Sequence, residues 1–335
     1  MQGKCLIILE GLKVMGFGKG EAMKPEEVEK VAIIGAGTMG HSMALVFAIS
    51  GIEVNLVDID EGILATARNK MTKALETLVE AGRIQRGKSR EILDLVMTST
   101  DIEASAAEAD FIAEAVPEVP EVKKEVFTRL DMSCRPDAVM ASNTSGLDIF
   151  QLVEISNPGR LLIAHWFNPP HVIPLVEVVP GPQTEPETVA FTASLMVRIG
   201  KFPVVMKGFT RAFIVNKIQN MISLAVFELL GSGLVTPEEI DRAVKYSLGI
   251  RLPIIGVVQS LDFTGLDLVL DLLKSYGLNN PIIEEKVALG HLGVKTSRGL
   301  YDYGNRTEEE ICRTRDVLFL QLLDFLEKMD AFKPI

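Results

Sequence analysis

The stretch "KVAIIGAGTMGHSMALVFAISG", residues 30–51, joins a short apolar run, three closely spaced glycines and a longer run with apolar residues at helical spacing. This pattern predicts a strand, a tight turn and a helix, with Gly51 at the position of a C-terminal helix cap. The following "IEVNLVDID", residues 52–60, predicts a second buried strand. Strands that alternate with helices are typical of a parallel sheet with right-handed crossovers.

The glycines in "GAGTMG" follow the GxGxxG pattern between the predicted strand and the predicted helix. In this context the first glycine permits the turn, the second lets the backbone approach a pyrophosphate, and the third lets helix pack on strand. Asp58 ends the second strand 18 residues after Gly40, where a carboxylate binds both ribose hydroxyls and repels a 2′-phosphate. The acid favours NAD over NADP as the cofactor. The alternative, a glycine-rich turn that binds no cofactor, is disfavoured because the strand, the spacing and the acid are all present. The predicted cofactor residues are Gly35, Gly37, Thr38, Met39, Gly40 and Asp58.

The rest of the chain divides into a part with short, strand-like apolar runs and a part with apolar residues at helical spacing. Further strand-like runs are "ADFIAEAVPE", "AVMASNTSG", "RLLIAHWF", "LVEVVPG" and "FPVVMKG", and long helices are predicted over residues 61–83 and 90–96. Beyond Phe209 the apolar residues recur at helical spacing, and "TPEEIDRAVKYSLG" opens with an N-cap threonine and a proline at the first helical position. A chain of 335 residues favours two domains. We predict an α/β Rossmann-type NAD domain over residues 29–207 and an all-α C-terminal domain over residues 208–335.

Residues 1–28 are interpreted as an N-terminal extension, and Met23 is a candidate for the native start. The net charge of −11 argues against binding of duplex nucleic acid, because phosphate contacts need clustered lysine and arginine. The sequence has no apolar run of membrane-spanning length, so no membrane partner is expected. Three scattered cysteines, with no histidine at ligand spacing, indicate neither disulfides nor a metal site. A cytoplasmic protein with a small-molecule substrate is the simplest interpretation.

His165 ends one apolar run and Glu177 lies inside the next, with the short loop NPPHVIP between them. Because the loop is too short for a crossover helix, the two strands are predicted to be antiparallel neighbours. The carboxylate would then hold one imidazole nitrogen and leave the other free to take a proton from an alcohol. A core histidine with an unrelated glutamate is the alternative, although a glutamate in "LVEVV" is costly to bury unpaired. His41, His171 and His291 are weaker candidates, and His171 is placed at the rim of the site.

Two further polar groups are candidates for the site. The segment Ser142–Gly146, "SNTSG", follows a predicted strand at the edge where such sheets bind ligands. It could bind a substrate oxygen or the nicotinamide ribose, or it could cap the next helix. Asn216 lies on the otherwise apolar face of a long helix, where it could reach the site or hydrogen-bond within a helix contact.

Five motifs in order resemble the L-3-hydroxyacyl-CoA dehydrogenase family, which includes 3-hydroxybutyryl-CoA dehydrogenases. They are the glycine pattern, "SNTSG", "HWFNPPHVIPLVEVVPG", "FIVNKIQ" and "KTSRGLYDY", within residues 29–304. The resemblance implies an NAD domain, a helical domain that forms a homodimer, and a substrate bound between the domains. It also implies a role for each matched residue: His165 as the base, Glu177 as its partner, Ser145 as a donor to the substrate oxygen, Asn216 as an orienting amide, and Glu114 and Asn143 near the nicotinamide ribose. Asn168 would help to lock the turn after His165.

The chain departs from this family at two places. Arg211-Ala212-Phe213 stands where Pro-Gly-Phe is usual, and Ala74 and Ala81 stand where CoA-using members carry a serine and a lysine. Replacement phosphate contacts could come from a basic turn that contains Arg83, Arg86 and Lys88, and the alternative is that this turn is only solvated.

The leading hypothesis is NAD-dependent oxidation of a short-chain L-3-hydroxyacyl-CoA. The "HWFNPPHVIPLVEVVPG" segment also resembles lambda-crystallin/L-gulonate 3-dehydrogenase relatives. The alternatives are therefore oxidation of a small CoA-free hydroxy acid or alcohol, with Arg211 as a carboxylate clamp, and a non-enzymatic NAD-binding protein.

Overall fold

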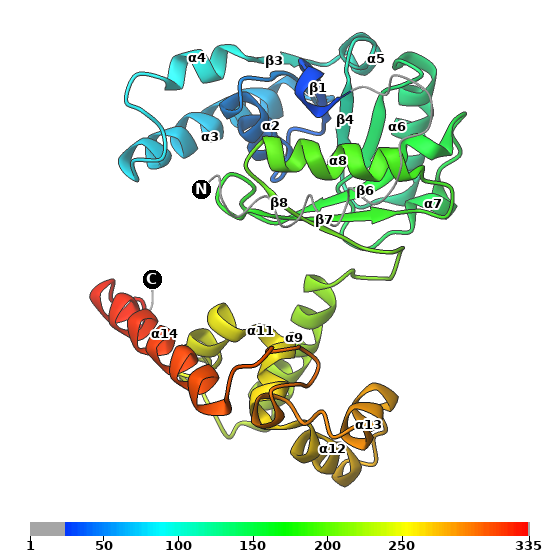
Figure 1. Ribbon diagram of the computed structural model, residues 1–335. Coiled ribbons are helices and arrows are strands. Elements are labelled where there is room, and N and C mark those ends of the chain that lie inside the picture. The colour runs from blue at the N-terminus through cyan, green and yellow to red at the C-terminus, as the bar shows by residue number, and fades with distance from the viewer. Residues whose placement is uncertain (1–23, 334–335) are drawn as a thin grey trace. The chain divides into compact units, whose positions relative to one another are not determined.

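The computed structural model describes residues 24–333, so the predictions for the first 22 residues and for Met23 lie outside the described residues. The chain forms two compact units that divide between Asn220 and Met221 (Figure 1). The sequence predicted the boundary between the α/β domain and the helical domain near residue 207. The segment from there to Asn220 belongs to the first unit because it packs on the sheet, as Phe213 does in one of its two cores.

The first unit is built on one eight-stranded sheet in the order β3-β2-β1-β4-β5-β6-β7-β8. Its strands are β1 Lys30–Ile34, β2 Glu53–Val57, β3 Val96–Ser99, β4 Phe111–Glu114, β5 Val139–Ser142, β6 Leu161–Trp166, β7 Leu175–Pro180 and β8 Phe202–Val205. All neighbours are parallel except β6 and β7, which are antiparallel. The predicted parallel sheet and the predicted β6–β7 pair are therefore confirmed.

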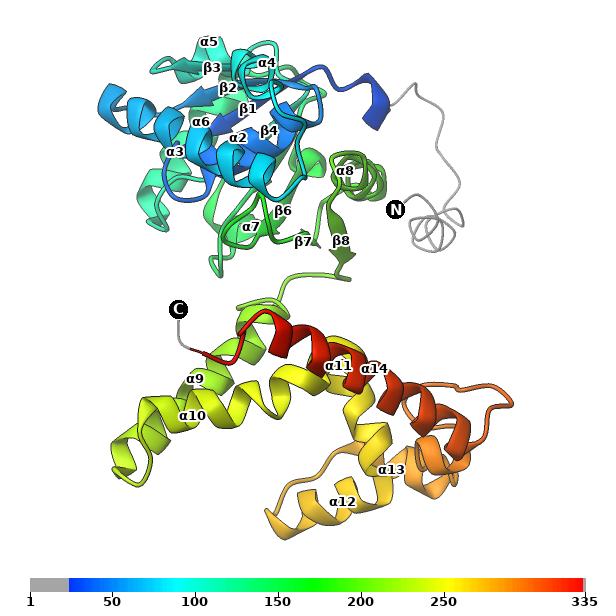
Figure 2. The ribbon, with the colours of Figure 1, turned by 90° about the vertical axis from the view of Figure 1, so that its left-hand side faces the viewer.

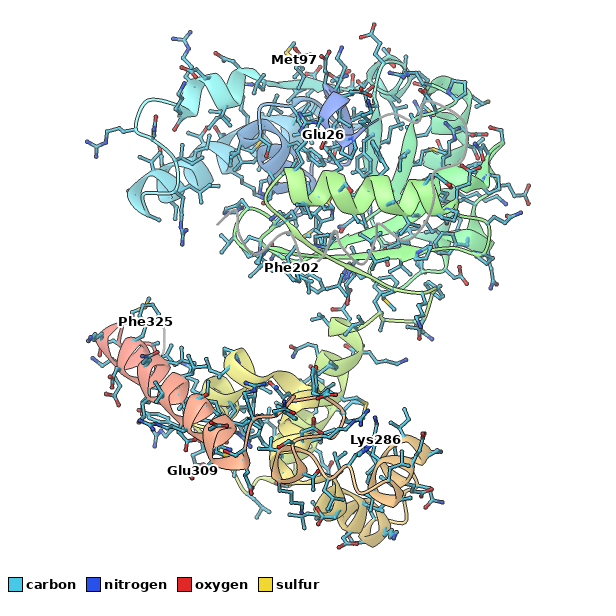
Figure 3. All side chains as sticks on the ribbon, in the orientation of Figure 1. Glu26, Met97, Phe202, Lys286, Glu309 and Phe325 are labelled. Carbon is cyan, nitrogen blue, oxygen red and sulfur yellow. The ribbon has the colours of Figure 1, made fainter. Side chains whose placement is uncertain are left out.

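Strand β3 corrects the sequence interpretation, which continued a helix to Val96. The helix α4 ends at Asp94, and the chain then pairs with β2, Val96 lying opposite Val54. Only Val96 of this strand is buried, because β3 is an edge strand. It therefore lacks the apolar alternation by which a strand is recognised. The exposed Met97 and Phe202 mark the two edge strands (Figure 3).

Helices cover both faces of the sheet. They are α2 Gly40–Ile49, α3 Glu61–Glu80, α4 Ser89–Asp94, α5 Ile102–Ala106, α6 Pro120–Ser133, α7 Ile149–Leu152 and α8 Pro186–Arg198, with short 3₁₀ turns at Pro25–Glu27 and Pro158–Arg160. Helices α2, α3 and α8 share a core with Trp166, and α5, α6 and α7 share the opposite core with Phe213. Figure 2 shows the helices around the sheet from a second side. Successive strand residues alternate between these cores, so His165 faces the side that holds Phe213.

The second unit is helical, as predicted. Its elements are α9 Val215–Ser232, which begins in the first unit, α10 Pro237–Lys245, α11 Leu248–Thr264, α12 Leu266–Ser275, α13 Pro281–Ala288, the 3₁₀ turn Val294–Thr296, and α14 Glu308–Lys328. Thr236 caps α10 through a reciprocal bond with Glu239, which confirms the predicted cap. Buried Asp262 accepts hydrogen bonds from Leu300 N, Tyr301 N and the Tyr303 hydroxyl, and so anchors the "GLYDY" segment.

Among residues 24–333 no single helix is long and apolar enough to cross a membrane. The pair α11 and α12, bent by 81°, meets the length and composition criteria only when the two helices are taken together.

Candidate active site

The glycine-rich turn between β1 and α2 has the geometry that the sequence predicts. Gly35 has φ +100°, and a Cβ on Gly40 would lie 1.7 Å from Gly35 O. Both positions therefore exclude a side chain for reasons internal to the fold. A Cβ on Gly37 would meet no protein atom within 4 Å. The open space beside Gly37 and the N-terminus of α2 fits a pyrophosphate, which such turns hold through backbone N–H groups.

Asp58 stands at the end of β2 beside this turn. Its Oδ2 accepts a hydrogen bond from Ala36 N at 2.8 Å, so the carboxylate is oriented by the turn itself. A mainly apolar cavity of about 500 Å³ lies here. Its lining includes Gly35, Gly37, Thr38, Met39, Asp58, Ile63 and Val122. An apolar slot with a carboxylate at its rim suits the adenosine half of NAD.

The predicted pair of His165 and Glu177 is formed. The two residues lie directly opposite each other in the antiparallel β6–β7 pair, and His165 Nδ1 is 2.7 Å from Glu177 Oε2. The imidazole packs against the rings of Phe167 at 4.6 Å and Phe213 at 5.1 Å. Its Nε2 has no hydrogen-bond partner among residues 24–333. The ring is thus held by one nitrogen and presents the other.

Glu177 is fully buried, and its second oxygen is held by two backbone N–H groups where helix α9 begins. Glu177 Oε1 accepts hydrogen bonds from Ile214 N at 3.0 Å and Val215 N at 2.9 Å. Burial alone would raise the pKa of Glu177, but the bonds from His165, Val215 and Ile214 outweigh it and lower the pKa. The carboxylate is therefore charged at neutral pH and fixes the proton of the imidazole on Nδ1.

The loop after β5 carries Ser145, which is exposed. Its backbone is held by Glu118, whose Oε1 accepts from Thr144 Oγ1 at 2.6 Å, Ser145 N at 2.8 Å and Gly146 N at 3.2 Å. Asn216 Nδ2 lies 3.5 Å from Ser145 O, so the structure brings this amide to the same loop. Glu118 was missed by the sequence analysis. Its signal was a second glutamate four residues after Glu114, in the loop at the ligand edge of the sheet.

Glu114 is the residue of β4 for which the resemblance implied a place near the nicotinamide ribose. It is fully buried, and its carboxylate binds Lys123 Nζ at 2.7 Å, Ser142 Oγ at 2.5 Å and Val116 N at 2.9 Å. Burial raises the pKa of Glu114, and the ion pair with Lys123 offsets only part of this. Protein groups therefore enclose the carboxylate of Glu114. The side chain ties strands β4 and β5 together behind the loops.

Asn143 and His171 fix the ends of other segments. Asn143 Oδ1 accepts a hydrogen bond from Trp166 N at 2.8 Å, so this amide holds the end of β6. His171, in the loop after β6, is partly buried and bonds Ser42 of α2. His41 Nδ1 is 2.6 Å from Gly37 O, and His291 belongs to the second unit just after α13.

The two segments at which the chain departs from the family, the basic turn and the turn at residues 211–213, lie in different parts of the first unit. Arg83 and Lys88 line a pocket with Gly51 and Leu95, which precede β2 and β3, so this turn lies at the amino edge of the sheet. His165 lies near the carboxyl end of β6, at the opposite edge. Ala212 and Phe213 have φ of +66° and +50°, a strained conformation for residues with a side chain.

Comparison with protein families identifies both units. Residues 30–209 match the family model for the 3-hydroxyacyl-CoA dehydrogenase NAD binding domain. Residues 213–303 match the model for the 3-hydroxyacyl-CoA dehydrogenase C-terminal domain.

Individual relatives differ in what their names say they act on. A 5-formyl-3-hydroxy-2-methylpyridine 4-carboxylate 5-dehydrogenase from Mesorhizobium japonicum is 33% identical over 82% of this chain and 91% of its own length. A 3-hydroxybutyryl-CoA dehydrogenase from Mycobacterium tuberculosis is 32% identical over 83% of this chain and 99% of its own. The crystal structure of a 3-hydroxyacyl-CoA dehydrogenase from Archaeoglobus fulgidus superimposes with a TM-score of 0.74 at 32% identity, covering 89% of this chain and 99% of that one.

Proposed function

The chain belongs to the 3-hydroxyacyl-CoA dehydrogenase family and is an NAD-dependent oxidoreductase, and we propose that it oxidises the secondary alcohol of a short-chain L-3-hydroxyacyl-CoA to the 3-oxoacyl-CoA. The observation that carries this proposal is the contact of His165 Nδ1 with Glu177 Oε2 at 2.7 Å. It leaves Nε2 as an oriented base at the carboxyl edge of the sheet, where ligands of this fold bind.

NAD, when bound, would accept the hydride from the substrate carbon that bears the hydroxyl. His165 Nε2 takes the hydroxyl proton during oxidation and returns it to the carbonyl oxygen in the reverse direction. Glu177 stabilises the imidazolium that forms, and the backbone N–H groups of Ile214 and Val215, at the start of α9, keep its second oxygen in place. Ser145 donates to the substrate oxygen, and Glu118 holds the backbone of Ser145 at the required position. Asn216 orients the same loop.

The proposed cofactor contacts are those of the glycine turn, with Asp58 for the adenine ribose and Asn143 for the nicotinamide end. Asn143 Oδ1 is engaged by Trp166 N, and its Nδ2 has no hydrogen-bond partner among the described residues, so it remains available as a donor.

A second candidate substrate is a small hydroxy acid without CoA. Arg211 is exposed and forms no ion pair with any residue of the described chain. Its turn adjoins the Ser145 loop, because a Cβ on Gly146 would lie 4.0 Å from Ala212 N. An unpaired guanidinium close to the reacting groups would bind a substrate carboxylate. The pyridine carboxylate in the name of the Mesorhizobium relative is of this chemical type.

The two substrates are distinguished by NADH oxidation with acetoacetyl-CoA and, in parallel, with free 3-oxo acids. Turnover of acetoacetyl-CoA supports the leading proposal, and turnover only of the free acids rejects it in favour of the second. His165→Ala should abolish turnover of either substrate and leave NADH binding intact. Arg211→Gln should raise KM for free acids about tenfold or more, as expected for a lost charged hydrogen bond, and should leave KM for acetoacetyl-CoA unchanged. Arg198→Gln, whose side chain binds Pro25 O and Val28 O, is the control.

We also propose that the chain acts in the cytoplasm as a homodimer. Helix α9 has eighteen residues, none of them buried, and its exposed side chains include Met221, Leu224 and Phe227. Phe325 of α14 is exposed too (Figure 3). Apolar side chains at this density are typical of a surface that a partner covers. Light scattering after size exclusion should give twice the chain mass, and a monomer at micromolar concentration would reject the dimer.

A further inference from the structure

A contact between the cofactor helix and the loop of the catalytic histidine has no role in the mechanism above. Ser42 lies in the first turn of α2 and is 1% exposed. Its Oγ accepts a hydrogen bond from His171 N at 3.1 Å and lies 2.7 Å from His171 Nδ1. Two hydrogen bonds therefore join one buried hydroxyl to one residue that is 129 positions away in the sequence.

The hydrogen bonds of the Ser42 hydroxyl bear on the protonation state and tautomer of the His171 imidazole. Since Ser42 Oγ accepts from His171 N, its own proton is free to be donated, and His171 Nδ1 is the acceptor beside it. Donation of the Ser42 proton to His171 Nδ1 corresponds to a neutral ring with its proton on Nε2, and we infer this form for His171. Burial, together with the nearby charges of His41 and Lys201, lowers the pKa of His171, which favours the same neutral form.

The rest of the loop, residues 167–174, is held by hydrogen bonds from a residue that lies just before strand β8. Lys201 is buried and its Nζ donates to Pro170 O and, at 2.9 Å, to Ile173 O. Asn143 holds Trp166, the last residue of β6. Phe167 opens the loop with its ring 4.6 Å from that of His165. A displacement of the loop at His171 would therefore be felt at the catalytic imidazole.

We propose that the Ser42–His171 contact is a positioning device that couples cofactor binding on helix α2 to the orientation of the His165 loop. Ser42 and His171 are positioning residues and touch no reacting atom. The inference builds on the proposed role of His165 and adds a link between the two halves of the site. The physical basis is that a pair of partly buried hydrogen bonds joins helix α2, whose N-terminus would receive the pyrophosphate, to the loop that follows His165.

The first test measures NADH affinity by the fluorescence of the bound nucleotide, in the full chain. Ser42→Ala and His171→Leu should each weaken NADH binding by about fivefold or more, the lower range of site-to-site coupling. The double variant should bind no more weakly than either single one. Ser50→Ala is the matched control, because its hydroxyl bonds Val46 O at the far end of the same helix, and it should bind as the wild type does.

A pair of isosteres separates positioning from general damage to the fold. An asparagine amide reaches the place of Nδ1 and a glutamine amide reaches the place of Nε2, so His171→Asn should retain NADH affinity and His171→Gln should lose it. Both variants keep a polar side chain in the loop. Circular dichroism establishes that each one is folded.

A second measurement follows the loop itself. Hydrogen–deuterium exchange of a peptide that covers residues 167–174 should slow when NADH binds to the wild type or to Ser50→Ala, and should not respond in Ser42→Ala. The inference is overturned if His171→Leu binds NADH within twofold of the wild type, if the single effects multiply in the double variant, or if the loop of Ser42→Ala still responds. These results are independent of the substrate, so absence of turnover would reject the proposed function alone.

Discussion

Glu114 and Glu177 are both fully buried, and each lies 2.7 Å from a nitrogen of a basic side chain, Lys123 and His165 respectively. Their pKa values nevertheless move in opposite directions. Burial dominates for Glu114 and raises its pKa, whereas three hydrogen bonds overcome burial for Glu177 and lower its pKa. Two of those three come from backbone N–H groups of Ile214 and Val215.

The difference shows that the remaining contacts of a buried carboxylate decide its role. Lys123 is enclosed and also lies 3.3 Å from Glu118, so the Glu114 network is a closed structural tie behind the loops. His165 has its second nitrogen free of any protein partner in the described chain, so the Glu177 pair is able to exchange a proton. The following predictions test this contrast.

The largest effect is expected from Glu177→Gln. The amide cannot stabilise the imidazolium, and its NH₂ group would face either His165 or the donors on α9. We expect kcat to fall about 10²- to 10⁴-fold, the range for a lost or disoriented general base, with NADH affinity unchanged. Steady-state kinetics with the preferred substrate measure this loss, and Glu187→Gln on α8 is the control. A kcat within tenfold of the wild type would remove Glu177 from the mechanism.

The next effect concerns stability and is expected from Lys123→Met. The substitution leaves Glu114 buried without its cation, and a broken buried ion pair costs about 3–5 kcal/mol. Urea unfolding followed by the fluorescence of Trp166, the only tryptophan of the chain and a residue of the first unit, measures this loss. The double variant Glu114→Gln/Lys123→Met should recover part of it. A loss below 1 kcal/mol would mean that the pair is not closed to water.

A smaller effect is that the contributions of Glu177 and Glu114 to the free energy of unfolding should depend on pH in opposite directions. The folded pKa of Glu177 lies below its unfolded value of 4.5, so its contribution to the free energy of unfolding is present above pH 4.5 and is lost as pH falls through the folded pKa. The folded pKa of Glu114 lies above 4.5, so the folded state binds the extra proton. Its contribution is largest below pH 4.5 and declines as pH rises through the folded value.

The measurement is urea unfolding of the wild type, Glu177→Gln and Glu114→Gln at several pH values from about 3 to 7, because the Glu177 contribution is lost only below pH 4.5. The stability lost by Glu177→Gln should shrink toward acid pH, and the stability lost by Glu114→Gln should grow. Slopes of the same sign would show that the two sites do not differ as described.

The smallest effect is expected from Ala212→Gly, in the strained turn before the N–H groups that bind Glu177. Ala212 has φ +66°, which glycine adopts without strain. The free energy of unfolding should rise by about 0.5–1 kcal/mol, and kcat should stay within twofold because the contacts to Glu177 remain. Denaturation midpoints measure the gain. A loss of stability would mean that the Ala212 methyl group makes a contact worth more than the strain.

The cofactor half of the site was predictable because its signals are local. A glycine pattern after a strand, an acid at the end of the next strand and a helix that follows the turn lie within 29 residues, from Lys30 to Asp58. The pairing of His165 with Glu177 was also predictable, because a short loop between two apolar runs leaves only an antiparallel neighbour.

Long-range contacts were not predictable. Glu114 reads as a polar strand end, and only the position of Lys123 on the helix packed against it shows that the side chain is enclosed. Strand β3 has one buried residue and is defined by its pairing with β2. Glu118 and Ser42 have no motif of their own, and their roles follow from partners in other segments.

The sequence by itself determined the α/β first unit, the helical second unit, the glycine turn with Asp58, and the placement of His165 and Glu177 on neighbouring antiparallel strands. These features depend on residue periodicity and on spacing of a few residues, which constrain the backbone locally. Only the tertiary structure decided that Glu114 is enclosed and ties strands β4 and β5, that two backbone N–H groups hold Glu177, and how the loop of His165 is joined to helix α2. Those outcomes depend on hydrogen bonds between segments far apart in the chain and on the loss of water around them, which no local pattern encodes.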